Sequence, residues 1–240
     1  MRTITIMSHN RPKYLRKVLR SLILNDLDDW TVVLGQNATN ELEKCVHVAL
    51  STLAERCDVQ IHVPKRSKCV RDNPYYLQEF AFGKLGSELN ILLEDDTPVS
   101  NDITDLALAY LKQENKGLML SFNKFGRTEQ QGPVEIIEKR PYYTQNLAYA
   151  CTPDAWNIYL KRWWHDNNHG LDGNGYDYSI HGHSKLENQW CYGVACSRVT
   201  HIGAEGGVHP WHDGNRWIQA IFDSYTPPRV EKPVQYTFQQ

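Results

Sequence analysis

The sequence predicts an α/β protein with a mostly parallel central sheet, flanked by helices and followed by an aromatic-rich C-terminal elaboration. Short apolar segments of strand length alternate with amphipathic segments of helix length through the first half of the chain. The apolar run at residues 90–93 is too short for a helix and leads directly into Glu94, Asp95 and Asp96, as at the carboxyl end of a buried parallel strand. After about residue 125, glycine, proline, histidine and tryptophan become denser.

Strands and helices are expected to alternate from the N-terminus onward. Residues 3–7 alternate β-branched and apolar side chains, and Pro12 suits the first turn of the helix that follows. The expected strands cover residues 3–7, 30–34, 58–63, 90–93 and 117–122, and the expected helices cover residues 12–23, 41–56, 74–85 and 102–113. This order implies parallel pairing through right-handed crossovers. Because no low-complexity linker interrupts the chain, residues 1–240 are expected to form a single domain.

The composition is that of an ordinary globular protein. The chain has 240 residues, of which 41% are hydrophobic and 22% charged, and its formal net charge is −2, so no global attraction to nucleic acid or membrane is expected. No apolar stretch approaches the roughly 18 residues of a membrane span. The N-terminus lacks the apolar region of a signal peptide, and the six cysteines are scattered. A soluble, cytoplasmic protein is therefore expected, with its oligomeric state open.

The three adjacent carboxylates are the strongest chemical signal in the chain. Glu94, Asp95 and Asp96 repel one another, and burying them unpaired would cost several kcal/mol or more. A divalent metal that carries a phosphate would neutralise them. The alternative is a solvated acidic turn after a strand.

Phosphate recognition by a glycine-rich loop is not expected. The chain has neither a Gly-x-x-x-x-Gly-Lys-Ser/Thr motif nor a Gly-x-Gly-x-x-Gly motif opening the first helix, which argues against P-loop enzymes and dinucleotide dehydrogenases. A basic loop at residues 65–71 precedes the acidic strand. Its cations either balance surface charge or reach over a metal-bound phosphate, and Arg71 is the best single candidate for the second role.

Several segments resemble those of a GT-A glycosyltransferase and follow one another along the chain in the order expected for that fold. GT-A is the fold of enzymes that transfer sugars from nucleotide-sugar donors. Residues 92–96 (LLEDD) resemble the Asp-x-Asp motif in the Glu-Asp-Asp form of the N-acetylglucosaminyltransferases that initiate complex N-glycan branching. The other segments are 4–15 (ITIMSHNRPKYL), similar to the nucleoside-binding strand and helix, 146–156 (NLAYACTPDAW), 175–180 (GYDYSI), and 197–203 (SRVTHIG) with 206–209 (GGVH). The resemblance divides the domain into a nucleotide-sugar half, residues 1–125, and an acceptor half, residues 126–240.

The resemblance implies roles for individual residues. Asp96 is expected to bind the metal directly, while Asp95 and Glu94 serve the ribose and the water shell of the metal, with Asp95 as a second metal ligand. Either Mn²⁺ or Mg²⁺ is the expected cofactor, because both accept one or two carboxylates together with substrate phosphates. The residues expected at the nucleoside or ribose are Ser8, Asn10, Arg11 and Asn37. For Asn10 the alternative is a helix cap.

An inverting transfer needs a general base for the acceptor hydroxyl. Asp177 is the first candidate, since the neighbouring Tyr176 and Tyr178 would desolvate its carboxylate. Asp172 is the second candidate and Glu187 the third. The alternative for Asp177 is an ordinary loop acid.

A histidine from the C-terminal loop completes the metal site in some enzymes of this fold. We expect His209 in this role, because Gly206 and Gly207 make its loop flexible, and imidazole suits Mn²⁺ better than Mg²⁺. His201 lies in a strand-like run and is expected to be a packed, hydrogen-bonded residue. Trp163, Trp164 and Trp211 are candidates for stacking on a sugar or base, although most buried tryptophans are core.

The predicted function is thus metal-dependent, inverting transfer of a sugar from a UDP-sugar to an acceptor hydroxyl. The acceptor is a glycan or polysaccharide, or else a hydroxymethylated base in DNA, as in viral enzymes. Binding to DNA would require a basic strip on the surface. Residues 65–71 would supply one part of it, and one helix face would supply the other, formed by Lys13, Arg16, Lys17 and Arg20. The alternatives are a nucleotidyltransferase, which usually has a glycine-rich loop after its first strand, and a catalytically inactive carbohydrate-binding module of the same fold.

Overall fold

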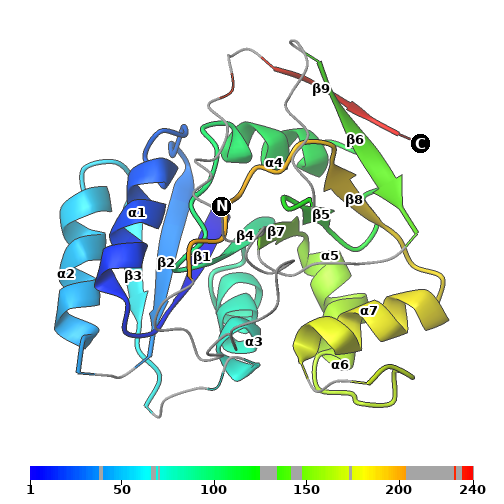
Figure 1. The fold of residues 1–240 in the computed structure, drawn as a ribbon, viewed down its shortest axis with the longest axis horizontal. Coiled ribbons are helices and arrows are strands. Elements are labelled where there is room, and N and C mark those ends of the chain that lie inside the picture. Colours follow the sequence, from blue (N-terminus) through cyan, green and yellow to red (C-terminus); the bar gives the residue numbers. More distant parts are fainter. Residues whose placement is uncertain are drawn as a thin grey trace, which may run out of the picture.

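A sheet with nine strands in the described part of the chain organises the protein (Figure 1). The computed structural model describes residues 1–240 except 38–39, 66–68, 70, 125–133, 142–147, 173–174, 204–229, 231–233 and 240. The strand order is β3-β2-β1-β4-β7-β5-β8-β6-β9. The strands are β1 (Arg2–Ser8), β2 (Trp30–Gln36), β3 (Asp58–His62), β4 (Leu89–Glu94), β5 (Leu120–Ser121), β6 (Val134–Arg140), β7 (Ala148–Cys151), β8 (Cys191–Val194) and β9 (Gln235–Phe238).

The first four strands pair in parallel, as the alternation of strands and helices predicts. Their registers bring the strand ends level, because Ser8 of β1 pairs with Gln36 of β2, and Met7 pairs with Glu94 of β4. The acidic residues therefore leave the sheet where β1 and β2 also end. This edge is the place at which open α/β sheets bind ligands.

The second half of the sheet is mixed. β7 lies between β4 and β5 and is antiparallel to both, and β6 and β8 are also antiparallel. β5 and β8 pair in parallel, as do β6 and β9. The strand expected at residues 117–122 is shorter than predicted, since only Leu120 and Ser121 enter the ladder. The sheet is thus mostly parallel, and each antiparallel pair includes β7 or β8.

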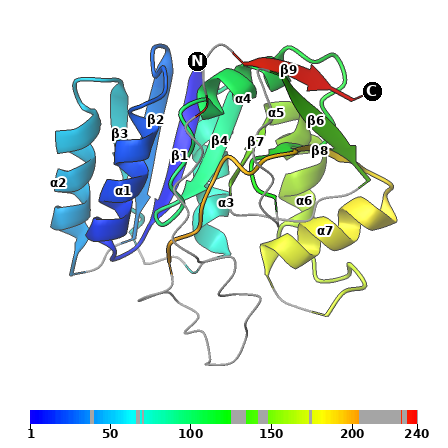
Figure 2. The ribbon, with the colours of Figure 1, turned by 45° about the horizontal axis from the view of Figure 1, so that its top comes forward.

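Helices cover both faces of the sheet (Figures 1 and 2). One core joins β1, β2 and β4 to α1 (Pro12–Leu22), α2 (Leu42–Leu53) and α4 (Ile103–Leu111). The opposite core holds the remaining helices, which are α3 (Asp72–Glu79), η1 (Phe80–Lys84), α5 (Pro153–Ala155), η2 (Trp156–Leu160), α6 (Lys161–Trp163) and α7 (Tyr176–Leu186).

The aromatic residues of the second half fill this opposite core. Trp164 stacks on Tyr176 with ring centroids 4.4 Å apart, and it meets Trp156 edge-on. Trp163 and Trp164 are 2% and 0% exposed, so they are core residues that offer no face to a sugar. Trp211 lies outside the described residues. No helix in the described ranges combines the length and apolar character that crossing a bilayer requires.

Candidate metal centre

A segment near the C-terminus lies along the turn that follows β4. Val99 and Val199 form an antiparallel bridge, and the backbone amide of Ser100 donates to the Arg198 carbonyl at 2.8 Å. The amide of Ile202 donates to the Asp96 carbonyl at 2.9 Å. These backbone contacts place residues 198–202 antiparallel to residues 96–100, and they bring His201 next to the acids.

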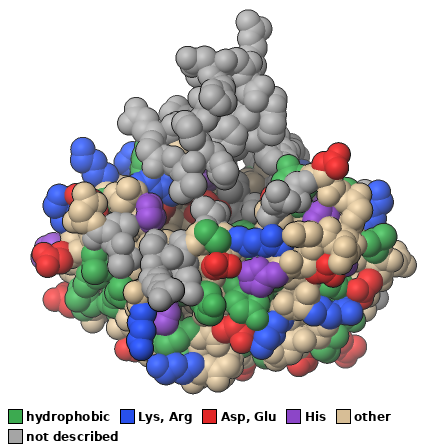
Figure 3. Space-filling model, turned by 90° about the horizontal axis from the view of Figure 1, so that it is seen from below, with side chains coloured by type: hydrophobic (Ala, Val, Ile, Leu, Met, Phe, Trp, Pro, Cys, Tyr) green, Lys and Arg blue, Asp and Glu red, His purple; other side chains and the backbone are tan. Residues whose placement is uncertain are grey.

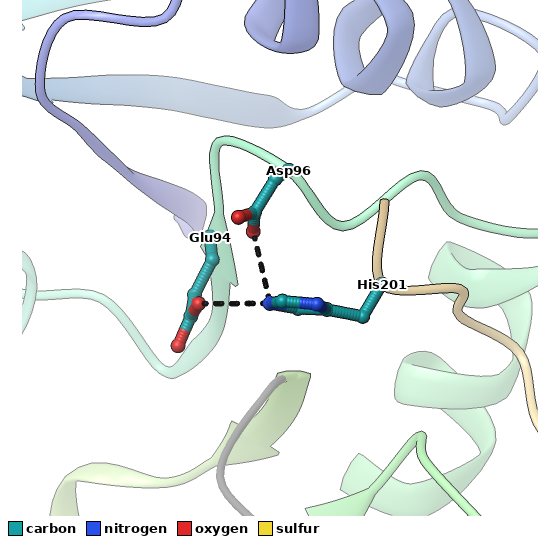
Figure 4. Close-up of side chains that lie close together, drawn as sticks. All are labelled: Glu94, Asp96 and His201. Atoms are coloured by element: carbon teal, nitrogen blue, oxygen red, sulfur yellow. Dashed lines mark ion pairs between the residues drawn. The ribbon is translucent and has the colours of Figure 1, made fainter. Parts of the chain in front are cut away.

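Glu94, Asp96 and His201 point toward one another (Figure 4). His201 Nε2 lies 3.9 Å from Glu94 Oε2 and 3.5 Å from Asp96 Oδ1. One ligand atom from each residue lies within 4.8 Å of the other two. Two ligand atoms that each lie about 2.1 Å from a shared ion are at most about 4.2 Å apart. The spacing of these three ligand atoms, up to 4.8 Å, is therefore close to the spacing that a divalent cation needs. Two carboxylates and an imidazole suit Mn²⁺.

Asp96 has a ligand position available for such an ion. Its Oδ1 atom is buried and accepts no hydrogen bond from any described residue. A buried carboxylate oxygen without a donor is costly. A cation between Asp96 and His201 would remove that cost, and these residues therefore fit a divalent metal.

Arg11 holds the other side of the acid cluster. Its Nη1 donates to Asp96 Oδ2 at 2.6 Å and its Nη2 donates to Asp95 Oδ1. The amide of His9 donates to Asp95 Oδ2 at 3.1 Å. When all groups are ionised, three carboxylates and one guanidinium carry a net charge of −2, which one divalent cation would balance. Arg11, expected at the nucleoside, thus supports the acids in this structure.

The electrostatics of the cluster follow from burial. Burial raises the pKa of Asp95 to about 6, even though the Arg11 guanidinium acts in the opposite direction. Burial, with the negative charges of Asp96 and Asp95, raises the pKa of Glu94 well above its usual range. Burial lowers the pKa of His201, and Asp96 opposes that shift. A neutral imidazole can bind a metal through Nε2, and a cation would favour the ionised carboxylates.

Gly203 closes over the cluster. A Cβ atom at this position would overlap Asp96 Oδ2 and lie 3.1 Å from Arg11 Nη1. Only glycine therefore lets the chain pass this close to the pair formed by Asp96 and Arg11. Sequence reasoning did not single out Gly203 within the segment 197–203.

The residues predicted for the nucleoside lie at the ends of β1 and β2, but several are enclosed. Ser8 is 2% exposed and Asn37 is 5% exposed, and the Asn37 amide donates to the Ser8 carbonyl at 3.0 Å. Asn10 is exposed. The helix-cap alternative for Asn10 is wrong, because Arg11 occupies the N-cap position of α1.

Gln36, for which no role was predicted, holds these two strand ends together. Its Nε2 donates to the carbonyls of His9 and Asn37.

Arg71 contacts the second half of the chain. Its Nε and Nη2 donate to the Trp164 carbonyl at 3.1 and 2.9 Å, and its guanidinium also donates to Asn167 Oδ1. Trp164 Nε1 donates back to the Arg71 carbonyl at 2.8 Å. This arrangement fastens the start of α3 to residues 164–167. A role for Arg71 at a phosphate stays a prediction.

The predicted bases lie in different surroundings. Asp177 is half-buried in the first turn of α7, and its negative charge contributes to the raised pKa of Glu94, so it lies within electrostatic reach of the acid cluster. Asp172 is exposed in the bend before α7. Glu187 accepts hydrogen bonds from Trp163 Nε1 and from Arg162, which gives it a structural role. His209 lies outside the described residues.

Comparison with known proteins identifies the fold. No protein-family model matches the chain, and no curated protein matches its sequence. Solved structures do match it. S. aureus TarS 1–349 superimposes with a TM-score of 0.56 at 13% identity, covering 83% of this chain and 60% of TarS 1–349. The glycosyltransferase GlyE of Streptococcus pneumoniae TIGR4 gives 0.51 at 11% identity over 78% of this chain and 44% of GlyE. The galactosyltransferase LgtC gives 0.51 at 10% identity over 78% of this chain and 70% of LgtC.

The fold is the GT-A fold of glycosyltransferases. The chain spans about 60% of the length of TarS 1–349. TarS 1–349 is known in complex with UDP and with UDP-GlcNAc, and LgtC in complex with donor and acceptor sugar analogues. At these identities the likeness establishes the GT-A fold, and activity has to be argued from the site.

Proposed function

We propose that this protein is a metal-dependent glycosyltransferase that moves a sugar from a UDP-sugar to an acceptor hydroxyl with inversion. The observation that carries the proposal is the convergence of Glu94, Asp96 and His201 at the carboxyl end of β4 in a GT-A fold. A bound divalent cation would neutralise the diphosphate of the donor and make the nucleotide a better leaving group.

Three side chains would bind the cation. Asp96 and His201 offer the two ligand atoms that lie 3.5 Å apart, and Glu94 faces them from the end of β4. Asp95 accepts from Arg11 and from the His9 amide, so it fixes the turn that presents Asp96. His201, from a segment a hundred residues later in the chain, takes the role that the sequence assigned to His209.

Asp177 is proposed as the general base. It is half-buried, belongs to the acceptor half of the chain, and acts electrostatically on Glu94. A base must reach the acceptor hydroxyl on the side of the sugar away from the nucleotide. Asp172 is the second choice, because it precedes the same helix but is exposed.

UDP-GlcNAc is the first donor to test. The sequence LLEDD at residues 92–96 resembles the motif of N-acetylglucosaminyltransferases, and TarS 1–349 binds UDP-GlcNAc. The exposed Asn10 and the strand ends carrying Ser8 and Asn37 are the proposed nucleoside side of the site. A glycan hydroxyl or a hydroxymethylated DNA base is the proposed acceptor.

The test is release of UDP from UDP-GlcNAc, measured with Mn²⁺ and with EDTA. Release should require Mn²⁺ and should be lost in Asp96→Asn and His201→Ala. The exposed Asp154→Asn is the matched control and should keep the wild-type rate. A panel of UDP-, GDP- and dTDP-sugars, first screened by thermal stabilisation, guards against a wrong choice of donor. Stabilisation without release would indicate an inactive binding module, and release of inorganic diphosphate from nucleoside triphosphates would indicate a nucleotidyltransferase.

A further inference from the structure

Helix α1 carries four cations on one exposed face. Lys13, Arg16, Lys17 and Arg20 follow one another at spacings of three, one and three residues, which places them on the same side of the helix. All four are exposed, and none forms an ion pair with any described carboxylate. The opposite side of α1 is buried in the core through Leu15, Val18, Leu19 and Leu22.

This concentration of charge is unfavourable for the helix itself. Like charges three or four residues apart destabilise a helix, and the face contains four such pairs. The protein as a whole has a formal net charge of −2, so the face does not reflect a generally basic chain. Figure 3 shows Lys and Arg side chains at several places on the face seen from below, including its left side, where Figure 1 shows α1 and α2. A repulsive face with no acidic partner among the described residues would be neutralised by a polyanion.

A groove continues the face toward α2. The groove has a volume of about 490 Å³ and its lining includes Lys13 and Arg16 of α1 and Lys44 and His47 of α2. Glu41 and Glu43 also line it, and Glu41 pairs with Lys44 at 3.0 Å. The positive side of the groove is therefore the α1 side.

The face begins at the candidate metal centre. Arg11, which contacts Asp95 and Asp96, immediately precedes Pro12 at the start of α1. From Lys13 to Arg20 the helix rises about 10 Å. A polymer lying along this face would have one end beside the acid cluster.

The chemistry of the face selects among polyanionic partners. A membrane-bound helix inserts its apolar side into the lipid, but the apolar side of α1 is already in the core. Stable protein interfaces are poor in lysine at their centre and rich in aromatic and apolar residues, and α1 has no exposed large hydrophobic residue. Lys and Arg side chains contact the phosphates of nucleic acids, and such contacts need no apolar surface.

We propose that Lys13, Arg16, Lys17 and Arg20 bind the phosphate backbone of a nucleic acid. The further step, that this nucleic acid carries the acceptor hydroxyl, rests on the proposed function. The binding itself does not, because it needs neither donor nor metal.

The experiment measures binding of a fluorescently labelled DNA duplex of 20 base pairs by anisotropy across a series of salt concentrations. The test variant combines Lys13→Gln, Arg16→Gln, Lys17→Gln and Arg20→Gln. The control variant makes the same change of charge at exposed cations on other elements, combining Arg56→Gln, Lys84→Gln, Lys112→Gln and Lys185→Gln. Thermal unfolding checks that both variants fold, and the test variant should be at least as stable as wild type because the repulsion is relieved.

The wild-type protein should bind the duplex with a steep salt dependence. Each phosphate neutralised contributes about 0.9 to the slope of log K against log salt, so the test variant should lose about 3 to 4 from this slope and at least tenfold in affinity at low salt. The control variant should change less than threefold. Equal losses in the two variants, or no binding of duplex by wild type at low salt, would overturn the proposal, as would binding to anionic vesicles in preference to DNA.

UDP release in the same two variants separates this proposal from the proposed function. The test variant should retain metal-dependent UDP release with water as acceptor, since its substitutions lie outside the acid cluster. If wild type releases no UDP but its DNA binding depends on the α1 face, the transferase assignment fails and the binding face stands. If UDP release is intact and DNA binding does not depend on the face, the binding proposal fails alone.

Discussion

Arg198 and Arg11 each lie between two carboxylates, but their surroundings differ. Arg198 is 0% exposed; its Nε donates to Asp102 Oδ2 at 2.9 Å, and its Nη2 lies 3.3 Å from Glu135 Oε2. Arg11 is 17% exposed and contacts Asp95 and Asp96, both 2% exposed. Both arginines thus join a pair of buried acids, and the difference lies in what else those acids bind.

The Arg198 cluster is closed. Asp102 also accepts from Tyr236 Oη at 3.0 Å and from Ser100 Oγ, and Glu135 Oε1 accepts two backbone amides at 3.1 Å. Every carboxylate oxygen in the cluster has a donor or a cationic partner. Burial and the negative charge of Asp102 raise the pKa of Tyr236, so its hydroxyl remains a donor. Because its carboxylate oxygens are all satisfied, this cluster has a structural role.

The acid cluster around Arg11 is open. It holds a third carboxylate, Glu94, and Asp96 Oδ1 has no hydrogen-bond donor among the described residues. One guanidinium does not balance three acids. A surplus of negative charge, more than the presence of buried charge, therefore distinguishes the candidate metal centre from the structural cluster. The two clusters are linked, because Arg198 fixes the segment that carries His201 three residues later.

Arg198→Met should have the largest effect of the changes considered, and it should act on folding. Removing the guanidinium leaves Asp102 and Glu135 buried without their cation, which costs about 3–5 kcal/mol. Urea unfolding should show this loss in the free energy of unfolding. The exposed Arg56→Met should cost less than about 0.5 kcal/mol. A loss below about 1 kcal/mol for Arg198→Met would show that the cluster is not a structural anchor.

Asp96→Asn should have the opposite profile, with a large loss of function and little loss of stability. The substitution keeps the shape of the side chain and removes the charge that faces His201 and Arg11. Metal-dependent UDP release should fall by about 10²-fold or more, while the free energy of unfolding without metal changes by less than about 2 kcal/mol. If Asp96→Asn lowered the free energy of unfolding as severely as it lowered UDP release, the acid cluster would be structural, like the Arg198 cluster.

Gly203→Ala should disturb the open cluster from outside. The added Cβ would overlap Asp96 Oδ2, and relieving an overlap in a packed site costs about 1–3 kcal/mol. The affinity for Mn²⁺ should fall by about tenfold. Gly83→Ala is a suitable control, because a Cβ there meets nothing within 4 Å. Calorimetric titration with Mn²⁺ measures both variants, and wild-type affinity in Gly203→Ala would contradict the geometry of the cluster.

Glu94→Gln should have the smallest effect on stability, and a favourable one. The pKa of Glu94 in the folded protein is raised, so its contribution to stability is present at low pH and is lost as pH rises through the folded-state pKa. Without metal, Glu94→Gln should therefore stabilise the protein by ~1 kcal/mol at pH 7.5 and by much less at pH 5. Thermal unfolding at the two pH values in EDTA tests this. Destabilisation at pH 7.5 would mean that Glu94 has a stabilising partner in the folded state.

Local sequence pattern was enough to predict the first half of the fold. Strands and helices up to residue 113 lie close to where periodicity places them, because their apolar faces alternate at periods that local sequence reveals. The acid cluster was also predictable, since three carboxylates after an apolar run are unusual in themselves. The antiparallel insertion of β7 beside β4 was not predicted, because strand neighbours depend on contacts between distant segments.

The residues that contact Glu94, Asp95 and Asp96 could not be predicted from local sequence pattern. His201 reaches Glu94 and Asp96 only because residues 198–202 pair with residues 96–100, a contact that spans about a hundred residues. Arg11 was recognised as a site residue but was assigned to the nucleoside, because nothing in its own segment shows that Asp95 and Asp96 lie beside it. Complementary charge between the two segments was the available signal.

Calorimetric titration of Mn²⁺ into the protein in the presence of UDP tests the central claim most directly, with wild type compared with His201→Ala and the exposed His165→Ala as control. Wild type and His165→Ala should each bind one Mn²⁺ per chain, and His201→Ala should lose at least tenfold in affinity. Unchanged Mn²⁺ affinity in His201→Ala would contradict the assignment of Glu94, Asp96 and His201 as the metal centre.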